Sequence, residues 1–463
     1  MGLSRETWSI RVHEIGHQKS ILTGKRKYDT VQSQLMTKHS RCLLGLELGM
    51  DKPNRTLFGM TGKLVYQKAF RTRPPRREVS MTETIVRFGI IGCGLMAREF
   101  ASATQRWGHL LNMNVRPKLV AIADTKPSCL DWFTDNLCDI TTAVADYREL
   151  LADPDVDAVY CAVPHHLHAQ IYGDIIRAGK HLLGEKPFGI DLAANAQILT
   201  ELCAHPQVFA RCSSEFPFFP GPTQIIKYWQ EGRFGKIIEV EAGFWHSSDM
   251  DPQKPINWKR MIQFNGEYGC MGDLGMHVLH IPLRFGWTPA NVRGLLSKIV
   301  SERPDGKGGL APCETWDNAV LACEVQTAEQ HFPMLLSTKR IAPGETNTWF
   351  IRIHGTELSV EFTTKYPKTL RSLTFRPGKP QCWEVLDLGY TPPYATITGG
   401  IFEFGFSDSI LQMYAAFCDE LVHGRDGMRQ PFACATPEET HMHHRVLTAA
   451  LTSGRTGQTV AIA

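Results

Sequence analysis

The sequence predicts an α/β protein in which a doubly wound parallel sheet is followed by a second α/β domain with a large, open, mostly antiparallel sheet. Three observations support this prediction. Strand and helix signals alternate from Thr84 onward, which is typical of a parallel sheet covered by helices on both faces. A glycine-rich turn joins the first of these strands to the first helix. Further along, residues 320–375 contain short apolar strands separated by polar turns, which predicts a meander.

The glycine turn lies in the stretch VRFGIIGCGLMA. A buried strand ends at Ile91, Gly92 and Gly94 follow, and a helix is predicted over Leu95–Gln105. In a dinucleotide-binding turn the first glycine allows the tight bend, the second lets the backbone approach a pyrophosphate, and a small residue such as Ala97 keeps the helix close to its strand. An ordinary strand-to-helix turn would show the same letters, so the turn alone does not decide the function.

A second apolar strand, LVAIAD, ends at Asp124, about thirty residues after the first glycine. A carboxylate at this place can accept hydrogen bonds from the ribose hydroxyls of a dinucleotide, and it would repel a 2'-phosphate. The sequence therefore favours NAD, while the adjacent Thr125 and Lys126 keep NADP open.

Composition excludes several other classes of protein. The chain has 463 residues, 43% of them hydrophobic and 21% charged, which indicates a globular protein of two or three domains. Its 13 cysteines show no CxxC pairs, so neither a zinc site nor a disulfide framework is expected, and we expect a cytoplasmic setting. There is no apolar run near the ~18 residues that a membrane span requires.

Residues 1–80 form a basic leader with 16 Lys and Arg against 6 Asp and Glu, whereas the rest of the chain has 34 against 41. The basic excess is thus confined to the leader, and no nucleic-acid-binding surface is expected in the body. The leader contains no recognisable motif. We interpret it as a mobile tail or an upstream extension, with Met81 as a plausible start.

Polar side chains follow two further strands of the predicted sheet. The strand Val156–Val163 stops at Pro164, and His165 and His168 open the next helix, Ala169–Ala178. The strand at 180–183 then runs directly into Gly184-Glu185-Lys186-Pro187. Both sets lie at the carboxyl edge of the sheet, where ligands of such folds bind. The first domain is expected to span residues 84–207 and the second residues 208–463.

Lys186 is the first candidate catalytic residue. A lysine that follows a buried strand at the ligand-binding edge can stabilise the alkoxide that forms when a carbinol carbon loses its hydride. The alternative is a surface lysine paired with Glu185.

Asp273, His277 and His280 form a second cluster, since a helix places positions i, i+4 and i+7 on one face. A neutral histidine can take a hydroxyl proton at physiological pH, and a carboxylate can orient it. We therefore predict His277 as the general acid/base and Asp273 as its partner. The alternatives are a polar helix–sheet junction and a metal site, for which no further ligand pattern exists.

Substrate contacts are expected from the polar, aromatic segment between the strand Lys236–Phe244 and this helix, because aromatic faces and hydrogen-bonding groups suit a polyhydroxylated ring. The candidates are His246, Trp258, Lys259, Tyr268 and, on the helix, His280, although core packing is the alternative for such aromatic residues. Lys339 and Arg340 near a strand end have either a substrate-binding or a turn-forming role. Two C-terminal helices are predicted over 412–422 and 438–451, and His441, His443 and His444 on the second indicate a solvated surface.

These pieces, in this order, resemble the glucose-fructose oxidoreductase, inositol dehydrogenase and MocA-like family (Gfo/Idh/MocA). The matching segments are GIIGCGLMA, LVAIAD, AVYCAVP, AGKHLLGEKP, GDLGMH at 272–277 and the C-terminal ALTSGRTGQTVAI. The resemblance covers residues 84–463 and implies a Rossmann domain, a second domain whose open sheet mediates homo-oligomer contacts, and a cis Lys186–Pro187 bond. Val163-Pro164-His165 stands where relatives have Thr-Pro-Asn, a departure that concerns the contacts on the nicotinamide side. Glu215 replaces the arginine or asparagine-arginine pattern of relatives, which indicates a different substrate.

The resemblance also implies residue roles. Catalysis would rest on Lys186, Asp273 and His277. Cofactor contacts would come from Gly92, Gly94, Leu95, Met96, Ala97, Asp124, Val163, Pro164, His165, His168, Glu185 and Lys186. No metal is expected.

The predicted function is NAD(P)-dependent transfer of a hydride between nicotinamide and a hydroxyl-bearing carbon of a sugar, cyclitol or glycoside. Two alternatives remain open. The first is an enzyme that retains its NAD and cleaves a glycoside, or eliminates a group, through a transient ketone. The second is a non-catalytic dinucleotide or sugar sensor.

Overall fold

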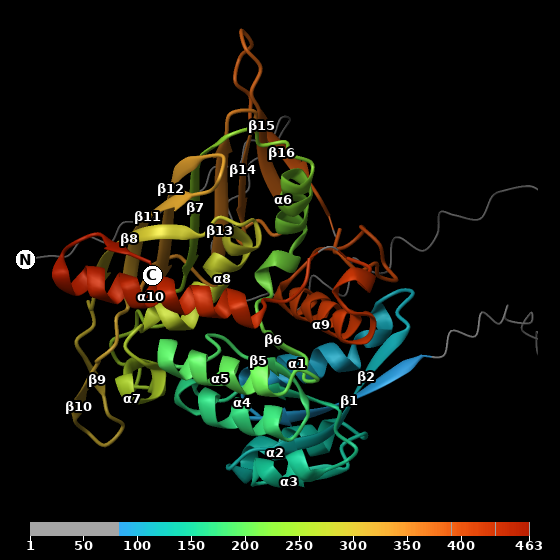
Figure 1. Ribbon diagram of the computed structural model, residues 1–463. Helices are drawn as coiled ribbons and strands as arrows, with labels where there is room; N and C mark the ends of the chain where they lie inside the picture. The colour runs from blue at the N-terminus through green and yellow to red at the C-terminus, as the bar shows by residue number, and fades with distance from the viewer. Residues whose placement is uncertain (1–82, 390, 431, 463) are drawn as a thin grey trace, which may run out of the picture. The chain divides into compact units, whose positions relative to one another are not determined.

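The computed structural model describes residues 83–389, 391–430 and 432–462. They belong to one compact unit, Glu78–Ala463. The predicted basic leader, residues 1–80, lies outside the described residues. Within this unit, the described elements form two large sheets with helices around and between them (Figure 1).

The first sheet has six parallel strands in the order β3-β2-β1-β4-β5-β6. The strands are β1 (Thr84–Ile91), β2 (Val115–Ala123), β3 (Thr142–Val144), β4 (Ala158–Cys161), β5 (His181–Gly184) and β6 (Ala210–Cys212). The helices that connect them are α1 (Leu95–Gln105), α2 (Pro127–Asn136), α3 (Tyr147–Ala152), α4 (His168–Arg177) and α5 (Leu192–Ala204). The strand order reverses between β1 and β4, and ligands of doubly wound sheets bind at the carboxyl ends around such a point.

Strand β1 shows why this sheet is covered on both faces. Phe88 and Ile90 belong to the core that contains Phe100 of α1, whereas Ile91 belongs to a second core on the opposite face. Between them, a Cβ on Gly89 would lie 2.8 Å from a methyl carbon of Leu150 on α3. Both faces of the strand are therefore buried against apolar side chains, which explains its nearly continuous apolar sequence.

The first sheet extends further along the chain than expected. Strand β6 pairs with β5 and ends at Cys212, five residues beyond the predicted boundary at 207. The Cys212 backbone N–H then donates to the carbonyl of Ala435, far along the chain. The short ARC strand has too little apolar pattern to reveal this pairing.

The second sheet has nine strands in the order β16-β15-β14-β13-β7-β12-β11-β8-β17. All neighbours are antiparallel except β7 and β12, which are parallel. The strands are β7 (Ile237–Trp245), β8 (Pro289–Ser297), β11 (Asn318–Gln326), β12 (His331–Lys339), β13 (Thr348–Gly355), β14 (Leu358–Thr363), β15 (Thr369–Thr374), β16 (Glu384–Asp387) and β17 (Val460–Ala461). A separate pair consists of β9 (Glu302–Pro304) and β10 (Leu310–Pro312). The predicted fold class is confirmed.

The remaining α-helices are α6 (Pro220–Gln230), α7 (Ile262–Asn265), α8 (Cys270–Arg284), α9 (Phe406–His423) and α10 (Pro437–Thr456). Single 3₁₀ turns cover Trp107–His109, His165–Leu167, Phe216–Phe218, Trp258–Arg260 and Arg425–Gly427. Within the described ranges, no helix is both long and apolar enough to span a bilayer.

The two C-terminal helices join the sheets. Helix α9 packs on α1, with the Tyr414 ring 4.2 Å from that of Phe100, and α10 packs against α5, α8 and β8 (Figure 1). Helix α10 begins with a capping box of Thr436 and Glu439, and its C-terminal end is capped by Gly457, which has φ 70°.

The histidines of α10 correct one prediction. His443 and His444 are fully buried, and the ring Nε2 of His444 lies 2.8 Å from the Pro187 carbonyl oxygen. The predicted solvated surface is wrong because α10 is covered by elements of both domains.

Candidate functional site

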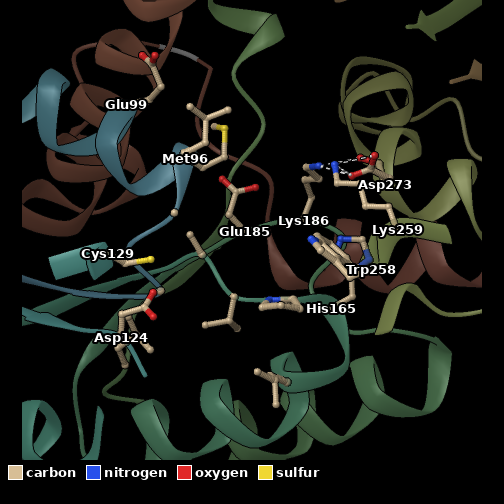
Figure 2. Close-up of a pocket in the computed structure, with 18 of the residues that line it drawn as sticks. Met96, Glu99, Asp124, Cys129, His165, Glu185, Lys186, Trp258, Lys259 and Asp273 are labelled. Carbon is tan, nitrogen blue, oxygen red and sulfur yellow. Dashed lines mark hydrogen bonds and ion pairs between the residues drawn. The ribbon is translucent and has the colours of Figure 1, made fainter. Parts of the chain in front are cut away.

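A cavity of about 1100 Å³ is bordered by residues of both domains. It runs from the glycine turn and Asp124 at one end to Lys186, Lys259 and Asp273 at the other, with Glu185 between them (Figure 2). The carboxyl ends of β1, β2, β4 and β5 therefore face the helix α8 across one open space.

The glycine turn forms the first end of this cavity. Gly92 has φ +87°, and a Cβ on it would lie 2.6 Å from the Ala162 carbonyl oxygen, so only glycine fits. A Cβ on Gly94, which borders the cavity, would meet nothing within 4 Å. At this N-cap the described chain provides no side-chain hydrogen bond and no acidic residue in the first turn of α1. The first-turn N–H groups are thus exposed to an anion, which fits a dinucleotide pyrophosphate.

Asp124 lies directly after β2 and borders the cavity. Its Oδ2 accepts from the Cys93 backbone N–H at 2.8 Å, and its Oδ1 accepts from the Lys126 N–H at 2.8 Å. These two bonds hold the carboxylate against the glycine turn and leave acceptor capacity on both oxygens. The arrangement fits ribose hydroxyls.

Most predicted cofactor residues line the cavity, but two do not. Ala97 is fully buried in the core between α1 and the sheet. His168 is buried as well, with Nε2 3.1 Å from the Val163 carbonyl oxygen and Nδ1 accepting from the Gly189 N–H at 3.3 Å. We therefore correct the expectation of direct contact for both, because each supports the backbone beneath the cavity. Those that line it are Gly92, Gly94, Leu95, Met96, Asp124, Val163, Pro164, His165, Glu185 and Lys186.

Asp273, in the first turn of α8, is the centre of a charge cluster at the other end of the cavity. Lys186 Nζ donates to its carbonyl oxygen at 2.8 Å and to Oδ1 at 3.0 Å. Lys259 Nζ donates to Oδ1 at 2.9 Å and to Oδ2 at 3.0 Å (Figure 2). Arg340 Nη1 also donates to Oδ2. The bond between Lys186 and Pro187 is cis, as the family resemblance implied.

These charges determine the protonation states in the cluster. Burial opposes ionisation of Asp273, but the charges of Lys186, Lys259 and Arg340 hold its pKa well below its usual value. Burial also opposes the Lys186 ammonium, yet the Asp273 and Glu185 carboxylates more than offset this and raise its pKa. For Lys259, burial together with the neighbouring Arg340 and Lys186 charges lowers the pKa to about 8.

His277, one turn further along α8, is buried at the same end of the cavity. Burial lowers the pKa of its imidazole well below the usual value, so the ring is neutral. Its Nδ1 lies 3.3 Å from Ser214 Oγ and 3.8 Å from Glu215 Oε2. The acidic side chain beside His277 is therefore that of Glu215. Asp273, the predicted partner, directs its carboxylate to the three cations instead.

Glu215 follows β6 and borders the cavity, although only 3% of its surface is exposed. Burial, followed by the charge of Glu185, raises the pKa of its carboxyl to about 8. The site thus contains an ionised carboxylate, Asp273, and a carboxyl that is protonated at neutral pH.

Three of the five predicted substrate residues, His246, Trp258 and Lys259, line the cavity. The hydroxyl oxygen of Tyr268 instead lies 2.7 Å from Oγ1 of Thr448 on α10. The buried His280 ring packs 5.0 Å from that of Phe432. We therefore correct the expectation that Tyr268 and His280 face the substrate, since both point into the interface with the C-terminal segment. Among the described residues, no group of three or more His, Cys, Asp or Glu side chains is arranged to hold a metal ion.

Several lining residues were not predicted. Glu99 could have been found, because it lies one helical turn after Leu95. Arg340 is a partial exception, because the sequence left a substrate-binding and a turn-forming role open for it. It follows β12, whose parallel pairing with β7 brings it beside α8, and no local signal reveals that pairing. The others include Cys129, Gln170, Asn347 and Phe406.

Comparison with known proteins places these observations in context. Residues 86–212 match the family described as "Oxidoreductase family, NAD-binding Rossmann fold". Levoglucosan dehydrogenase of Pseudarthrobacter phenanthrenivorans is 25% identical over 233 residues, which cover 48% of this chain and 58% of that protein. The NADP⁺-dependent D-xylose 1-dehydrogenase of Hypocrea jecorina is 30% identical over 173 residues, which cover 36% of this chain and 44% of that protein. The chain therefore spans only about half of the length of these curated relatives.

Solved structures share the whole fold. Levoglucosan dehydrogenase in complex with NADH superposes with a TM-score of 0.72 at 20% identity, covering 82% of this chain and 100% of that one. An NAD-binding oxidoreductase from Klebsiella pneumoniae gives a TM-score of 0.73 at 23% identity, again covering 82% and 100%. At these identities the likeness concerns the fold.

Proposed function

We propose that the chain is an NAD(P)-dependent dehydrogenase of the Gfo/Idh/MocA family, whose NAD-binding Rossmann-fold model matches residues 86–212. It would transfer a hydride between nicotinamide and a hydroxyl-bearing carbon of a sugar, cyclitol or glycoside. One observation carries this proposal. A single cavity joins a glycine turn suited to a dinucleotide with a lysine and a neutral histidine suited to carbinol chemistry.

The cofactor, when bound, supplies the hydride acceptor or donor. The N–H groups at the start of α1 would hold its pyrophosphate, and Asp124 would bind the adenosine ribose. This leaves the region of His165, Glu185 and Lys186 for the nicotinamide. NAD is favoured by the Asp124 carboxylate, and the solved levoglucosan dehydrogenase complexes contain NADH. Lys126 beside Asp124 keeps NADP open.

The reacting hydroxyl would lie between His277 and Lys186. The Nε2 of His277 has no hydrogen-bond partner in the described part of the chain, and the ring is neutral, so it can accept the hydroxyl proton. Lys186 has one N–H left after its two bonds to Asp273, and this donor can stabilise the developing alkoxide. Asp273 is then the residue that positions the ammonium.

Glu215 favours a second candidate function, the redox-neutral reaction. In that reaction the transient ketone acidifies a neighbouring C–H bond, a base removes that proton as the leaving group departs, and the hydride is returned. This chemistry requires a second acid/base group besides His277, and Glu215, 3.8 Å from His277, is such a group.

The two named relatives that act on levoglucosan and D-xylose support a carbohydrate substrate. Assembly into a homo-oligomer and a cytoplasmic location are further parts of the proposal.

A screen of sugars, cyclitols and glycosides with NAD⁺ and with NADP⁺ tests the proposal. We expect reduced cofactor to accumulate in step with a ketone or lactone product. Product formation at constant cofactor absorbance would support the redox-neutral reaction. Binding of cofactor and sugar without any product would contradict both reactions and indicate a sensor.

A further inference from the structure

The charge cluster around Asp273 holds more positive than negative charge. Lys186, Lys259 and Arg340 all contact Asp273, and Arg340 also contacts Asp249. Asp249 in turn contacts Lys254 and Arg260, and Arg260 reaches Asp317. The five cations in this network thus share three carboxylates, and counting the nearby Glu185 still leaves an excess of one positive charge. Glu215 adds none at neutral pH, since burial raises its pKa to about 8.

We propose that the substrate carries an anionic oxygen group, a carboxylate or a phosphate, that binds to Lys259 and Arg340 beside Asp273. This inference rests on the proposed dehydrogenase function and specifies its substrate class.

The donors that remain at these side chains support the proposal. Lys259 uses two of its three N–H groups on Asp273. Arg340 uses three of five, on Asp273, Asp249 and Ser248, so two remain. Both residues line the cavity, and the Lys259 side chain is 29% exposed whereas that of Asp273 is 1% exposed. The cavity wall here therefore presents unused donors on cations, while both carboxylate oxygens of Asp273 already accept hydrogen bonds from them.

The cofactor phosphates do not account for these donors. The predicted pyrophosphate site lies at the start of α1, and a 2'-phosphate would lie near Asp124. In Figure 2 Asp124 lies at the opposite end of the cavity from Lys259 and Asp273, with Glu185 between. A charged group at the Lys259 end must therefore come from the substrate. Burial, together with the Arg340 and Lys186 charges, lowers the pKa of Lys259 to about 8 in spite of Asp273, so a further anion beside it would stabilise its ammonium form.

Paired ligands test this inference directly. The NAD⁺-loaded protein is titrated calorimetrically with hexuronates and hexose 6-phosphates of the gluco, galacto and manno series, each against its neutral hexose. We expect at least one anionic member to bind about tenfold or more tightly than its neutral parent, since hydrogen bonds between charged groups are stronger than those between neutral groups. The uronate and phosphate arms distinguish the two sources of charge.

Lys259→Met should lower the preference for the anionic over the neutral ligand by roughly 10- to 100-fold, and Lys259→Arg should retain most of it. Lys254→Met is the matched control, because it removes one charge of the same network outside the cavity lining and should change the preference by about fivefold or less.

Neutral hexoses that bind as tightly as all their anionic counterparts would overturn the inference. So would a Lys259→Met variant that weakens both kinds of ligand equally. If anions are preferred but no cofactor is reduced, the proposed dehydrogenase function fails and the anion site stands. If neutral sugars are oxidised with no preference for anions, the dehydrogenase stands and the anion site fails.

Discussion

Asp273→Asn is the most informative substitution in the charge cluster. The Asp273 side chain is 1% exposed, and its two carboxylate oxygens accept from Lys186, Lys259 and Arg340. Asparagine keeps the shape but removes the negative charge, and it replaces one acceptor with an N–H₂ group that faces cations. Three positive charges would then remain in a buried site without their common partner.

The expected cost can be derived from these contacts. Breaking a buried ion pair by removing one partner costs about 3–5 kcal/mol of the free energy of unfolding. The protein can reduce this cost by releasing a proton from Lys259, whose pKa is already lowered to about 8. At an effective dielectric of ~20, the interaction of the Lys259 ammonium with a unit negative charge ~3 Å away is worth about 5 kcal/mol. If the substitution removes half of this energy, the pKa of Lys259 falls by about two units.

The deficit should therefore depend on pH. A lysine whose folded-state pKa is below its unfolded value binds fewer protons when folded, so the free energy of unfolding rises with pH between the two values. In the wild type this window begins near pH 8, and in Asp273→Asn it begins near pH 6. We expect the variant to be about 3–5 kcal/mol less stable at pH 6 and to recover roughly 2.7 kcal/mol of this by pH 8.

Urea unfolding followed by tryptophan fluorescence at several pH values measures the effect. Asp155→Asn is the control, because Asp155 forms an ion pair with Arg87 but is 72% exposed, and it should cost less than about 1 kcal/mol. An Asp273→Asn variant as stable as the wild type at pH 6, or a deficit that does not change with pH, would refute the charge cluster.

Two other predictions concern the site, and a third concerns a buried histidine of α10 outside it. Gly94→Val should fold normally, since its Cβ meets nothing within 4 Å, but should weaken NADH binding more than about tenfold in a fluorescence titration; unchanged affinity would count against the pyrophosphate site. Glu215→Gln should gain stability relative to the wild type as the pH rises from about 5 to about 8, and the difference should stay constant above pH 8. The reason is that the wild-type Glu215 keeps its proton in the folded state over this range and loses it in the unfolded state. A difference that does not change with pH would contradict the raised pKa of Glu215. The wild type should lose stability as the pH falls below 6.5, because the unfolded state binds protons there and buried histidines such as His443 stay neutral in the folded state. In thermal melts, His443→Gln should reduce the dependence of stability on pH by up to about 1.4 kcal/mol per pH unit. An identical dependence would exclude His443 as a contributor.

Local signals explain what could be predicted from the sequence. Helix α1 begins and ends where expected, at Leu95 and Gln105, because a glycine turn marks its start and its apolar residues recur with helical spacing. Lys186 and His277 were identified because each belongs to a strongly patterned segment, and both border the cavity. The roles of these residues remain predictions.

Features that depend on pairing between distant segments were not predicted. Arg340 reaches Asp273 only because β12 pairs in parallel with β7, and Glu215 reaches His277 only because β6 joins the first sheet. Asp273 and His277 lie on one helical face, as spacing predicts, but spacing does not show which cations approach from other elements. Tyr268 likewise turns toward α10 because that helix returns to the site from the end of the chain.

The rate of cofactor reduction in Lys186→Met, compared with the wild type on a substrate from the screen, tests the central claim most directly. Because its ammonium is proposed to stabilise the alkoxide, we predict a rate about 10²–10³-fold lower, with NADH affinity within about threefold of the wild type, well under 1 kcal/mol. A variant that reduces the cofactor at close to the wild-type rate would contradict the account.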